Sequence, residues 1–542
     1  MNRNIKVGVA QINSHVGAID YNLKKIIKFI KLGKRKKIDL LCFPELSLVG
    51  YPPEDLVLSK NFLKNVKLAV KKIENIDKKI SYIIGYPKLI GSKVYNVAGV
   101  FINGKLAFEY KKINLPNYGV FDEQRYFSKG DTPLVFKFKG RTLCLTICED
   151  IWSDFKVVSN LKSPDLLINL SASPYSSDKE ADRIKLLTSI SKRNNMEVVY
   201  SNLIGGQDEL VFDGGSLILD SKGNIISKAK KFEEDFLVMN MIFEKKYKNI
   251  TFRQSKKDKL SSILSALSLG LRDYVLKNNF SKVVIGISGG IDSALVAAIA
   301  VKALGRRNVL GIAMPTEFNS KLSHDLASEL SHNLGFTLKT SPIQEVFENN
   351  LLLLRDSVYG KSSFDETEEN LQARIRANIL MATSNKLGCL LLATGNKSEI
   401  SMGYSTLYGD AAGGIAILKD IPKILVYKLA KFYNSCNPKN IIPKKIISRP
   451  ASAELRMNQK DSDSLPPYKV LDKILELYIE KGLEVGEICS ITKIKRSLVV
   501  DVVNKVNMNE FKRRQGPPGV KITSKAFGRD RRYPITNGFK EA

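Results

Sequence analysis

Lys282-Val-Val-Ile-Gly-Ile-Ser-Gly-Gly-Ile-Asp-Ser293 is the stretch that decides the fold of the second half of the chain. Its first part, Val283–Ile287, is a short apolar run typical of a buried strand, and Ser293–Leu304 has the composition of a buried helix. A glycine-rich turn from strand to helix directs backbone N–H groups and the positive end of the helix towards an anion. The stretch therefore predicts a phosphate site in an α/β nucleotide-binding domain.

The loop differs from the two commonest phosphate-binding motifs. No Gly-Lys-Ser/Thr follows it, and it does not have the GxGxxG spacing of dinucleotide-binding folds. Ser288-Gly-Gly-Ile-Asp-Ser293 instead resembles the pyrophosphate loop of the ATP-pyrophosphatase superfamily, whose members cleave ATP between the α and β phosphates. The resemblance implies that Asp292 holds Mg²⁺ against the phosphates. The alternative is an ordinary glycine turn with an aspartate at the start of a helix.

Motifs downstream narrow the family. They are Ala313-Met-Pro315 at a strand end, the helical run Glu368–Arg376, Thr394-Gly-Asn-Lys-Ser-Glu399 after the strand Leu390–Ala393, the segment Gly403–Asp410, and the terminal stretches Phe511–Gly519 and Phe527–Arg532. Together they resemble the NAD synthetase family over residues 260–535. For this half the resemblance implies a doubly wound parallel sheet with a helical C-terminal extension.

The same resemblance assigns site residues. Glu399 and Asp292 are expected to serve magnesium, and Glu399, Asn370 and Lys512 to contact deamido-NAD. Glu399 has a simpler alternative, a charge that complements a helix dipole. The expected ATP-binding residues are Gly286, Ile287, Ser288, Gly289, Gly290, Ile291, Asp292, Ser293 and Thr394.

Three further positions receive no role. Leu407 stands where some ammonia-dependent relatives have a lysine, so nothing is carried over there. Arg374 and Arg376 lie about 200° apart on a helix, which predicts that one of them lies on a solvated face.

The first half alternates short β-rich runs with amphipathic helices, which indicates another α/β domain. The expected helices include Tyr21–Leu32 and Lys179–Arg193. The expected strands are Ile5–Ala10, Asp39–Phe43, Ile80–Gly85, Val97–Ile102, Thr142–Ile147, Leu166–Leu170, Val198–Asn202 and Ser216–Asp220.

Three residues with reactive side chains lie at or just after these strands: Glu45, Lys112 and Cys148. A cysteine needs a base or a cation nearby to become a useful nucleophile. No histidine lies between residues 16 and 323, so a Cys–His pair within this half has only His15 available. A glutamate base and a lysine are the natural partners that remain.

The trio resembles the Glu-Lys-Cys triad of the nitrilase superfamily, and residues 1–245 follow that pattern. The resemblance implies an αββα sandwich in which Glu45 accepts the thiol proton, Lys112 stabilises the oxyanion, and Cys148 attacks the glutamine amide. Glu123 is a possible second carboxylate, and Cys144 is expected to be an inert core residue. The expected glutamine pocket is lined by Tyr118, Ser173 and Lys179.

We expect a glutaminase domain over residues 1–248, a basic polar linker over 249–261, and an NAD synthetase domain over 262–542. Together they predict amidation of deamido-NAD through an acyl-adenylate, with ammonia made at Cys148 and passed to the second site. An ammonia tunnel and a homo-oligomer are further implications of the resemblance.

Composition and charge limit the classes of partner that we expect for this chain. The net charge of +30 suggests nucleic acid, but the lysines are scattered without an aromatic-and-basic stripe. We therefore expect small-molecule substrates (glutamine, ATP and deamido-NAD) with Mg²⁺, and neither nucleic acid nor membrane as a partner. Six cysteines without close pairs, and no apolar run of about 20 residues, favour the cytoplasm.

Three alternatives stay open. Another ligase with a pyrophosphate loop shares Ser288–Ser293, but is expected to lack the Glu369-Asn370 helix and the Lys512–Gln515 segment. A basic RNA-binding modifying enzyme is a second alternative, which salt-sensitive tRNA binding would reveal. A synthetase that runs on ammonia alone, with a degenerate glutaminase, is the third.

Overall fold

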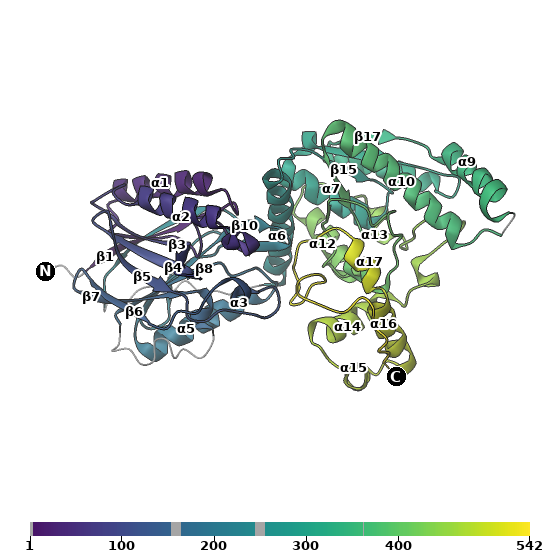
Figure 1. The fold of residues 1–542 in the computed structure, drawn as a ribbon. Coiled ribbons are helices and arrows are strands. Elements are labelled where there is room, and N and C mark those ends of the chain that lie inside the picture. The colour runs from purple at the N-terminus through teal and green to yellow at the C-terminus, as the bar shows by residue number, and fades with distance from the viewer. Residues whose placement is uncertain (1–3, 153–163, 244–254, 361–362, 542) are drawn as a thin grey trace. The chain divides into compact units, whose positions relative to one another are not determined.

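The computed structural model describes residues 4–152, 164–243, 255–360 and 363–541, and divides into two compact units, Met1–Gln254 and Ser255–Ala542 (Figure 1). Each unit has its own sheets and its own apolar core, so each is described separately below.

The first unit contains two six-stranded sheets. One has the order β14-β1-β2-β3-β4-β5 and the other β13-β12-β9-β8-β7-β6. Strands β1, β2 and β3 are parallel, as are β7, β8 and β9, so the carboxyl ends within each trio share one edge of their sheet. The first sheet comprises β1 (Ile5–Gln11), β2 (Leu40–Cys42), β3 (Ser81–Ile90), β4 (Lys93–Ile102), β5 (Lys105–Lys111) and β14 (Asp235–Met241). The second comprises β6 (Leu134–Phe138), β7 (Arg141–Ile147), β8 (Leu166–Ser171), β9 (Glu197–Asn202), β12 (Leu217–Leu219) and β13 (Ile225–Lys228).

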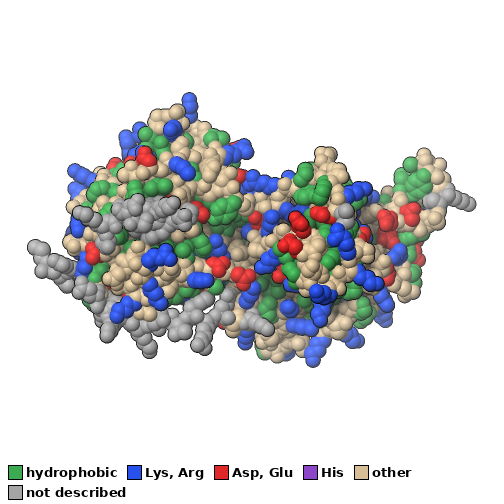
Figure 2. Space-filling model, turned by 90° about the horizontal axis from the view of Figure 1, so that it is seen from below, with side chains coloured by type: hydrophobic (Ala, Val, Ile, Leu, Met, Phe, Trp, Pro, Cys, Tyr) green, Lys and Arg blue, Asp and Glu red, His purple; other side chains and the backbone are tan. Residues whose placement is uncertain are grey.

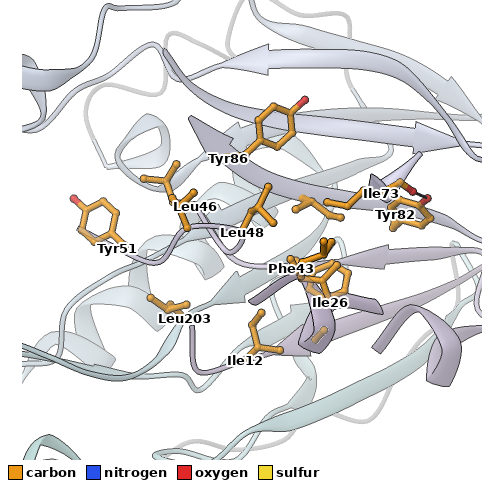
Figure 3. Close-up of a cluster of buried hydrophobic side chains, with 14 of the residues drawn as sticks. Ile12, Ile26, Phe43, Leu46, Leu48, Tyr51, Ile73, Tyr82, Tyr86 and Leu203 are labelled. Carbon is orange, nitrogen blue, oxygen red and sulfur yellow. Dashed lines mark hydrogen bonds between the residues drawn. The ribbon is translucent and has the colours of Figure 1, made fainter. Parts of the chain in front are cut away.

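Three apolar clusters stack the first unit into four layers. Side chains from both sheets, among them Val9, Leu145 and Val199, fill the space between the sheets. Helices α1 (Ile19–Arg35) and α2 (Lys60–Ile73) cover the first sheet through the cluster drawn in Figure 3. Helix α5 (Lys179–Asn194) covers the second sheet. The predicted αββα sandwich is therefore confirmed.

Smaller elements complete the first unit. They are the hairpin β10 (Ile204–Gln207) and β11 (Leu210–Asp213), helix α3 (Glu123–Tyr126), and the short 3₁₀ helices η1 (Glu54–Leu58) and η2 (Cys148–Ile151).

The second unit is built on a five-stranded parallel sheet of order β17-β16-β15-β18-β19. The order reverses between β15 and β18, which is where doubly wound folds bind ligands. This confirms the predicted parallel architecture. The strands are β15 (Val283–Gly286), β16 (Val309–Ala313), β17 (Thr337–Thr340), β18 (Leu390–Ala393) and β19 (Ile415–Ala416).

Helices cover the parallel sheet. Ile375 of α10 and Phe347 of α9 pack with the strand residues Val284, Ile312 and Leu391 in one apolar cluster. Helix α7 is almost wholly buried and packs against α6 and α12. The helices are α6 (Lys256–Lys277), α7 (Ile291–Leu304), α8 (Lys321–Leu334), α9 (Gln344–Leu354), α10 (Glu366–Leu387), α11 (Lys397–Met402) and α12 (Lys423–Ser435), with η3 (Arg306–Asn308) and the π-helical turn η4 (Arg355–Tyr359).

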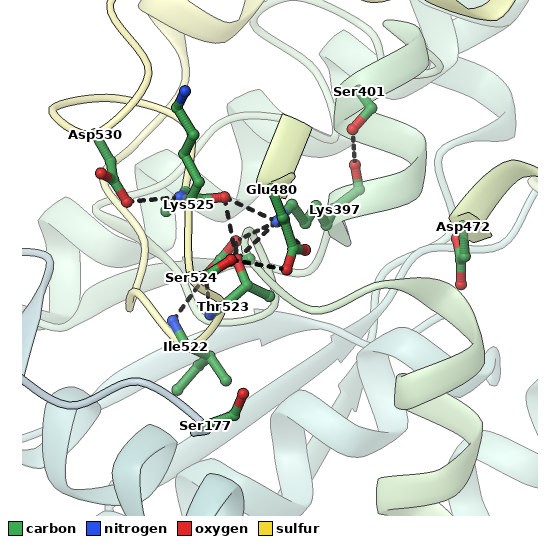
Figure 4. Close-up of polar contacts among 12 residues, drawn as sticks. Ser177, Lys397, Ser401, Asp472, Glu480, Ile522, Thr523, Ser524, Lys525 and Asp530 are labelled. Carbon is green, nitrogen blue, oxygen red and sulfur yellow. Dashed lines mark hydrogen bonds and ion pairs between the residues drawn. The ribbon is translucent and has the colours of Figure 1, made fainter. Parts of the chain in front are cut away.

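The C-terminal extension is mainly helical, as predicted, and a buried ion pair ties it to the sheet. Lys397 Nζ lies 2.9 Å from both Asp420 and Glu480 and donates to Thr523 Oγ1 at 2.7 Å, contacts among those drawn in Figure 4. Asp420 also accepts the backbone N–H of Thr523. The extension contains α13 (Lys444–Ser448), η5 (Asp461–Asp463), α14 (Tyr468–Leu475), η6 (Glu476–Glu480), α15 (Val485–Thr492), α16 (Arg496–Met508) and α17 (Glu510–Gln515).

The predicted linker, 249–261, is too long at its C-terminal end. Residues 249–254 lie outside the described residues, but α6 already begins at Lys256. Ser255 and Asp258 form a capping box that satisfies free N–H groups of the first turn, so the helix starts within this polar stretch. The domain boundaries otherwise stay a prediction.

Surface charge follows the expected scatter. On the face shown in Figure 2, Lys and Arg side chains are spread among Asp, Glu and apolar groups. Among the described residues, no helix combines the length and apolar character that a membrane crossing requires. The cytoplasmic location stays a prediction.

Candidate active sites

Glu45, Lys112 and Cys148, far apart in sequence, meet in the first unit. Each follows a strand, β2, β5 and β7 respectively. Lys112 Nζ donates to Glu45 Oε1 and to Glu123 Oε1, both at 2.7 Å. The structure thus places the predicted trio and Glu123 in one buried centre.

Burial and neighbouring charges together shift the pKa values of the side chains in this centre. Burial, and then Glu45, raise the pKa of the Cys148 thiol well above its ordinary value, while Lys112 opposes them. Burial alone would lower the pKa of Lys112, but Glu123 and Glu45 hold it well above the ordinary value. Burial also raises the pKa of Glu123 to about 7. The resting thiol is therefore protonated and needs a base when it attacks.

Further hydrogen bonds hold the carboxylates of Glu45 and Glu123 in place. Asn96 Nδ2 donates to Oε1 at 2.8 Å, and the backbone N–H of Ala172 donates to Oε2 at 2.9 Å. Tyr51 OH donates to Glu123 Oε1 at 2.8 Å. These bonds orient both carboxylates around the ammonium of Lys112.

Two of the three residues predicted for the glutamine pocket, Tyr118 and Lys179, interact with the carboxylate of Glu149. Tyr118 OH donates to the Glu149 carboxylate at 3.0–3.1 Å. Lys179 Nζ lies 3.7 Å from the ring centroid of Trp152, and its charge acts on both Cys148 and Glu149. Ser173 is buried after β8, where its N–H donates to Asn202. The sequence interpretation missed Glu149, although it directly follows Cys148.

A cavity of about 550 Å³ lies at the carboxyl ends of β15, β16 and β18. Thr394 and every predicted loop residue from Gly286 to Ser293 except Gly289 line it. Gly289 has φ +73°, and a Cβ there would lie 2.3 Å from the Ser323 carbonyl oxygen, so the position requires glycine. The glycine thus lets the loop pack closely against Ser323 in the first turn of α8.

Lys423 lies between two carboxylates in this cavity. Its Nζ is 2.6 Å from Asp292 Oδ2 and 2.7 Å from Glu399 Oε1. Burial raises the pKa of Glu399 to about 7, although Lys423 opposes the shift. Asn396 Nδ2 donates to Asp292 Oδ1 at 2.9 Å. Sequence reasoning missed Lys423, because a single lysine is inconspicuous in so basic a chain.

The predicted dinucleotide contacts are only partly brought together. Glu399 and Lys512 both line a smaller cavity of about 40 Å³. Lys512 Nζ donates to the carbonyl oxygens of Gly403 and Ser405. Asn370 lines neither of these two cavities, and its side chain accepts a hydrogen bond from Thr406 Oγ1 at 2.7 Å.

Arg374 and Arg376 diverge as their helical spacing predicts. Arg374 is exposed and donates to the Leu407 carbonyl oxygen, whereas Arg376 lines the larger cavity and donates to the Met314 carbonyl oxygen. Burial lowers the pKa of Arg376 to about 10. Arg376 is thus a cation in the cavity that the sequence interpretation did not assign.

Comparison with known proteins agrees with this pair of sites. Residues 6–244 match the carbon-nitrogen hydrolase family and residues 263–516 the NAD synthase family. A glutamine-dependent NAD(+) synthetase of Thermotoga maritima is 43% identical, over 99% of this chain and 100% of the relative. The chain belongs to the glutamine-dependent NAD(+) synthetases.

Other members of the glutamine-dependent NAD(+) synthetases agree in sequence and in fold. The Acinetobacter baylyi member is 42% identical over 99% of both chains. A solved structure of the Acinetobacter baumannii member, in complex with adenosine diphosphate, superposes with a TM-score of 0.80 at 40% identity. That match covers 99% of this chain and 100% of the other.

Proposed function

We propose that this chain makes NAD by amidating deamido-NAD with ATP and with nitrogen from glutamine. The observation that supports this most directly is the presence of two different sites in one chain. One is a buried cysteine beside a lysine and carboxylates, and the other is a phosphate loop facing a carboxylate pair. The first suits amide hydrolysis and the second suits ATP chemistry.

In the proposed glutaminase step, Glu45 accepts the proton of Cys148, and the sulfur attacks the side-chain amide carbon of glutamine. Lys112 stabilises the negative charge that develops on the amide oxygen. The C–N bond breaks as the nitrogen takes up the proton, which leaves ammonia and a thioester. Water then cleaves the thioester to glutamate and restores the thiol. Tyr118, Ser173 and Lys179 are proposed to hold the amino acid.

In the proposed synthetase step, the carboxylate of deamido-NAD attacks the α-phosphorus of ATP, and pyrophosphate leaves. Ammonia then attacks the acyl-adenylate carbon and AMP leaves. The loop Gly286–Ser293 and Thr394 are proposed to bind ATP, and Asn370, Glu399 and Lys512 to bind deamido-NAD. Lys423 is placed to contact the phosphates when the two carboxylates release it.

The residues present fit a magnesium ion. Mg²⁺ usually takes one or two carboxylates together with substrate phosphates and water. Asp292 and Glu399 converge on one point, and no cluster of three or more metal-binding side chains occurs in the described part of the chain. The two carboxylates would hold the ion, which when bound would neutralise phosphate charge.

Joining an ammonia source to an ATP-dependent ligase has a chemical reason. Ammonia in water near neutral pH is mostly protonated and cannot act as a nucleophile. Ammonia made at Cys148 and passed within the protein to the second site stays unprotonated. A homo-oligomeric assembly remains part of this proposal.

The proposal is tested by measuring NAD formation from deamido-NAD, ATP and Mg²⁺, with either glutamine or ammonium. Wild type is expected to use both donors, and Cys148→Ala only ammonium. Cys144→Ala, at a buried cysteine on the strand that leads to Cys148, is the matched control and is expected to keep both activities. A wild type inactive with both donors contradicts the assigned reaction, and a Cys148→Ala variant that still uses glutamine contradicts the assigned nucleophile.

A further inference from the structure

Asp150 is a fully buried carboxylate two residues after Cys148. It forms no ion pair within the described part of the chain. Its charge is instead satisfied by four hydrogen bonds, three of them from backbone N–H groups. A buried carboxylate held in this way is costly to keep, so its partners show what it does.

One side of the carboxylate closes the turn that carries the nucleophile. Asp150 Oδ2 accepts the backbone N–H of Ile147 at 2.9 Å, across Cys148 and Glu149. Cys148 itself has φ +42°, a left-handed conformation that is unfavourable for a residue with a Cβ. The bond from Ile147 to Asp150 therefore holds the strained turn that presents the thiol.

The other side of the carboxylate fixes the segment that carries Lys112. Asp150 Oδ1 accepts the N–H of Asn114 at 2.8 Å and that of Ile113 at 3.2 Å. Tyr110 OH, two residues before Lys112, donates at 2.8 Å to Oδ2, the oxygen that also accepts from Ile147. One carboxylate thus connects both flanks of Lys112 to the turn at Cys148.

We propose that Asp150 is the positioning residue of the glutaminase site, which sets the distance between the Cys148 thiol and the Lys112 ammonium. Its four hydrogen bonds come from Tyr110, Ile113, Asn114 and Ile147, and none of them comes from the side chains of Glu45, Lys112 or Cys148. This inference rests on the proposed function, because it presumes that Cys148 and Lys112 act on glutamine.

The geometry makes an amide a poor replacement. An asparagine has one acceptor oxygen, and its NH₂ group would face N–H or O–H donors on the other side. Asp150→Asn therefore breaks either the Ile147 bond or the Ile113 and Asn114 bonds, whereas the Tyr110 bond can reverse because a hydroxyl also accepts. A displacement of about 1 Å between reacting groups can cost on the order of 100-fold in rate.

The test uses the full-length enzyme and its two nitrogen donors. Asp150→Asn is expected to lower kcat with glutamine by on the order of 100-fold, with KM for glutamine changed less than about threefold. Ammonium-dependent synthesis is expected to stay at the wild-type rate. The rate at which iodoacetamide labels Cys148, measured by mass spectrometry, is expected to differ from that of wild type. This rate depends on the position of the thiol and not on the synthetase site.

A matched control exists in the same unit. Asp220 is also buried and accepts the backbone N–H groups of Lys222 and Asn224, but it lies beside the start of β9, at the opposite end of the sheet from Cys148. Asp220→Asn is expected to leave the glutamine-dependent kcat and the labelling of Cys148 unchanged. A purely structural role of Asp150 predicts the same behaviour for both variants.

Every outcome of these experiments either supports or overturns the positioning role of Asp150. Glutamine-dependent kcat within threefold of wild type in Asp150→Asn would overturn the inference. If that variant loses ammonium-dependent activity too, the decision passes to Tyr110→Phe, which removes one of the four bonds. Tyr110→Phe is expected to lower the glutamine-dependent kcat severalfold, and unchanged kcat and labelling would overturn the inference. If Cys148→Ala still uses glutamine, the assigned nucleophile and this inference are overturned together. If Cys148→Ala loses glutamine use but Asp150→Asn behaves as wild type, this inference alone is overturned.

Discussion

Each unit holds a lysine between two carboxylates, but the two centres differ in access to solvent. In the first, the side chains of Lys112, Glu45 and Glu123 are at most 5% exposed. In the second, Lys423 is 2% exposed, but Asp292 and Glu399 are 18% and 16% exposed and face the 550 Å³ cavity.

The difference indicates two uses of one arrangement. In each centre, burial raises the pKa of one carboxylate to about 7. In the enclosed centre the lysine and both carboxylates are shielded from solvent, so we expect the lysine to stay paired with them. In the open centre, we propose that a cation arriving with a ligand takes over the carboxylates and releases Lys423. Four predictions test this comparison.

Removing the enclosed cation is expected to have the largest effect. Lys112→Met leaves two buried carboxylates without a counter-ion, which typically costs about 3–5 kcal/mol. We expect glutamine-dependent NAD formation to be abolished. We also expect the midpoint temperature of thermal unfolding of the first unit to fall. Lys105→Met, on the exposed end of β5, is the control. A Lys112→Met variant with wild-type thermal stability would show that the centre is less enclosed than the structure indicates.

Removing the open cation is expected to spare stability more than activity. Lys423→Met should lower NAD formation about 100-fold with glutamine and with ammonium alike, because the charge that we propose to contact the phosphates is lost. The carboxylates can be hydrated through the cavity, so thermal stability should fall less than in Lys112→Met. Lys428→Met, on the exposed face of α12, serves as the control. Equal losses of stability in the two lysine variants would contradict the contrast between the centres.

The pH dependence of stability tests the enclosed centre in another way. The pKa of Glu123 is about 7 in the folded chain, against an ordinary 4.5, so the folded state binds the extra proton between these values. Stability from this group is therefore present at low pH and is lost as pH rises through about 7, by about 1 kcal/mol per pH unit. Thermal denaturation of wild type and Glu123→Gln between pH 5 and 8 measures the difference. The two curves should converge towards low pH, and parallel curves would refute the shift.

The smallest effect is expected at the edge of the same centre. Tyr51→Phe removes one hydrogen bond to Glu123, worth about 1 kcal/mol. The loss raises the pKa of Glu123 further, because this bond favours the charged form. We expect less than about a fivefold decrease in glutamine-dependent kcat and an unchanged rate with ammonium. A loss as large as that of Lys112→Met would mean that Tyr51 takes part in the reaction itself.

The sequence predicts best what is carried by apolar runs and by their ends. The buried strands β1, β7, β8 and β15 were predicted nearly to the residue, and the reactive residues that follow them could therefore be located. Strand β5 was missed because charged residues limit its apolar run to Leu106–Phe108, and β14 was missed although it contains the apolar run Phe236–Met239. Their place depends on pairing with β4 and β1, which lie closer to the core.

The predicted sites were incomplete for a related reason. Cys148 and Asp292 lie in recognisable local motifs, whereas Lys423 and Arg376 reach the cavity from distant helices. Among 85 lysines and arginines, only the fold distinguishes these two. The role proposed for Asp150 could not be predicted for another reason. It depends on the backbone N–H groups of residues 113, 114 and 147, and a sequence does not show which side chain accepts from a backbone group.

The ion pair of Lys397 makes the segment around Thr523 less dispensable than its distance in sequence from the nucleotide loop suggests. Thr523 shares Asp420 with Lys397, and Lys397 directly follows the asparagine that binds Asp292. A stop codon before Thr523 would remove that partner and loosen the neighbouring nucleotide site, so such an allele should behave as a null.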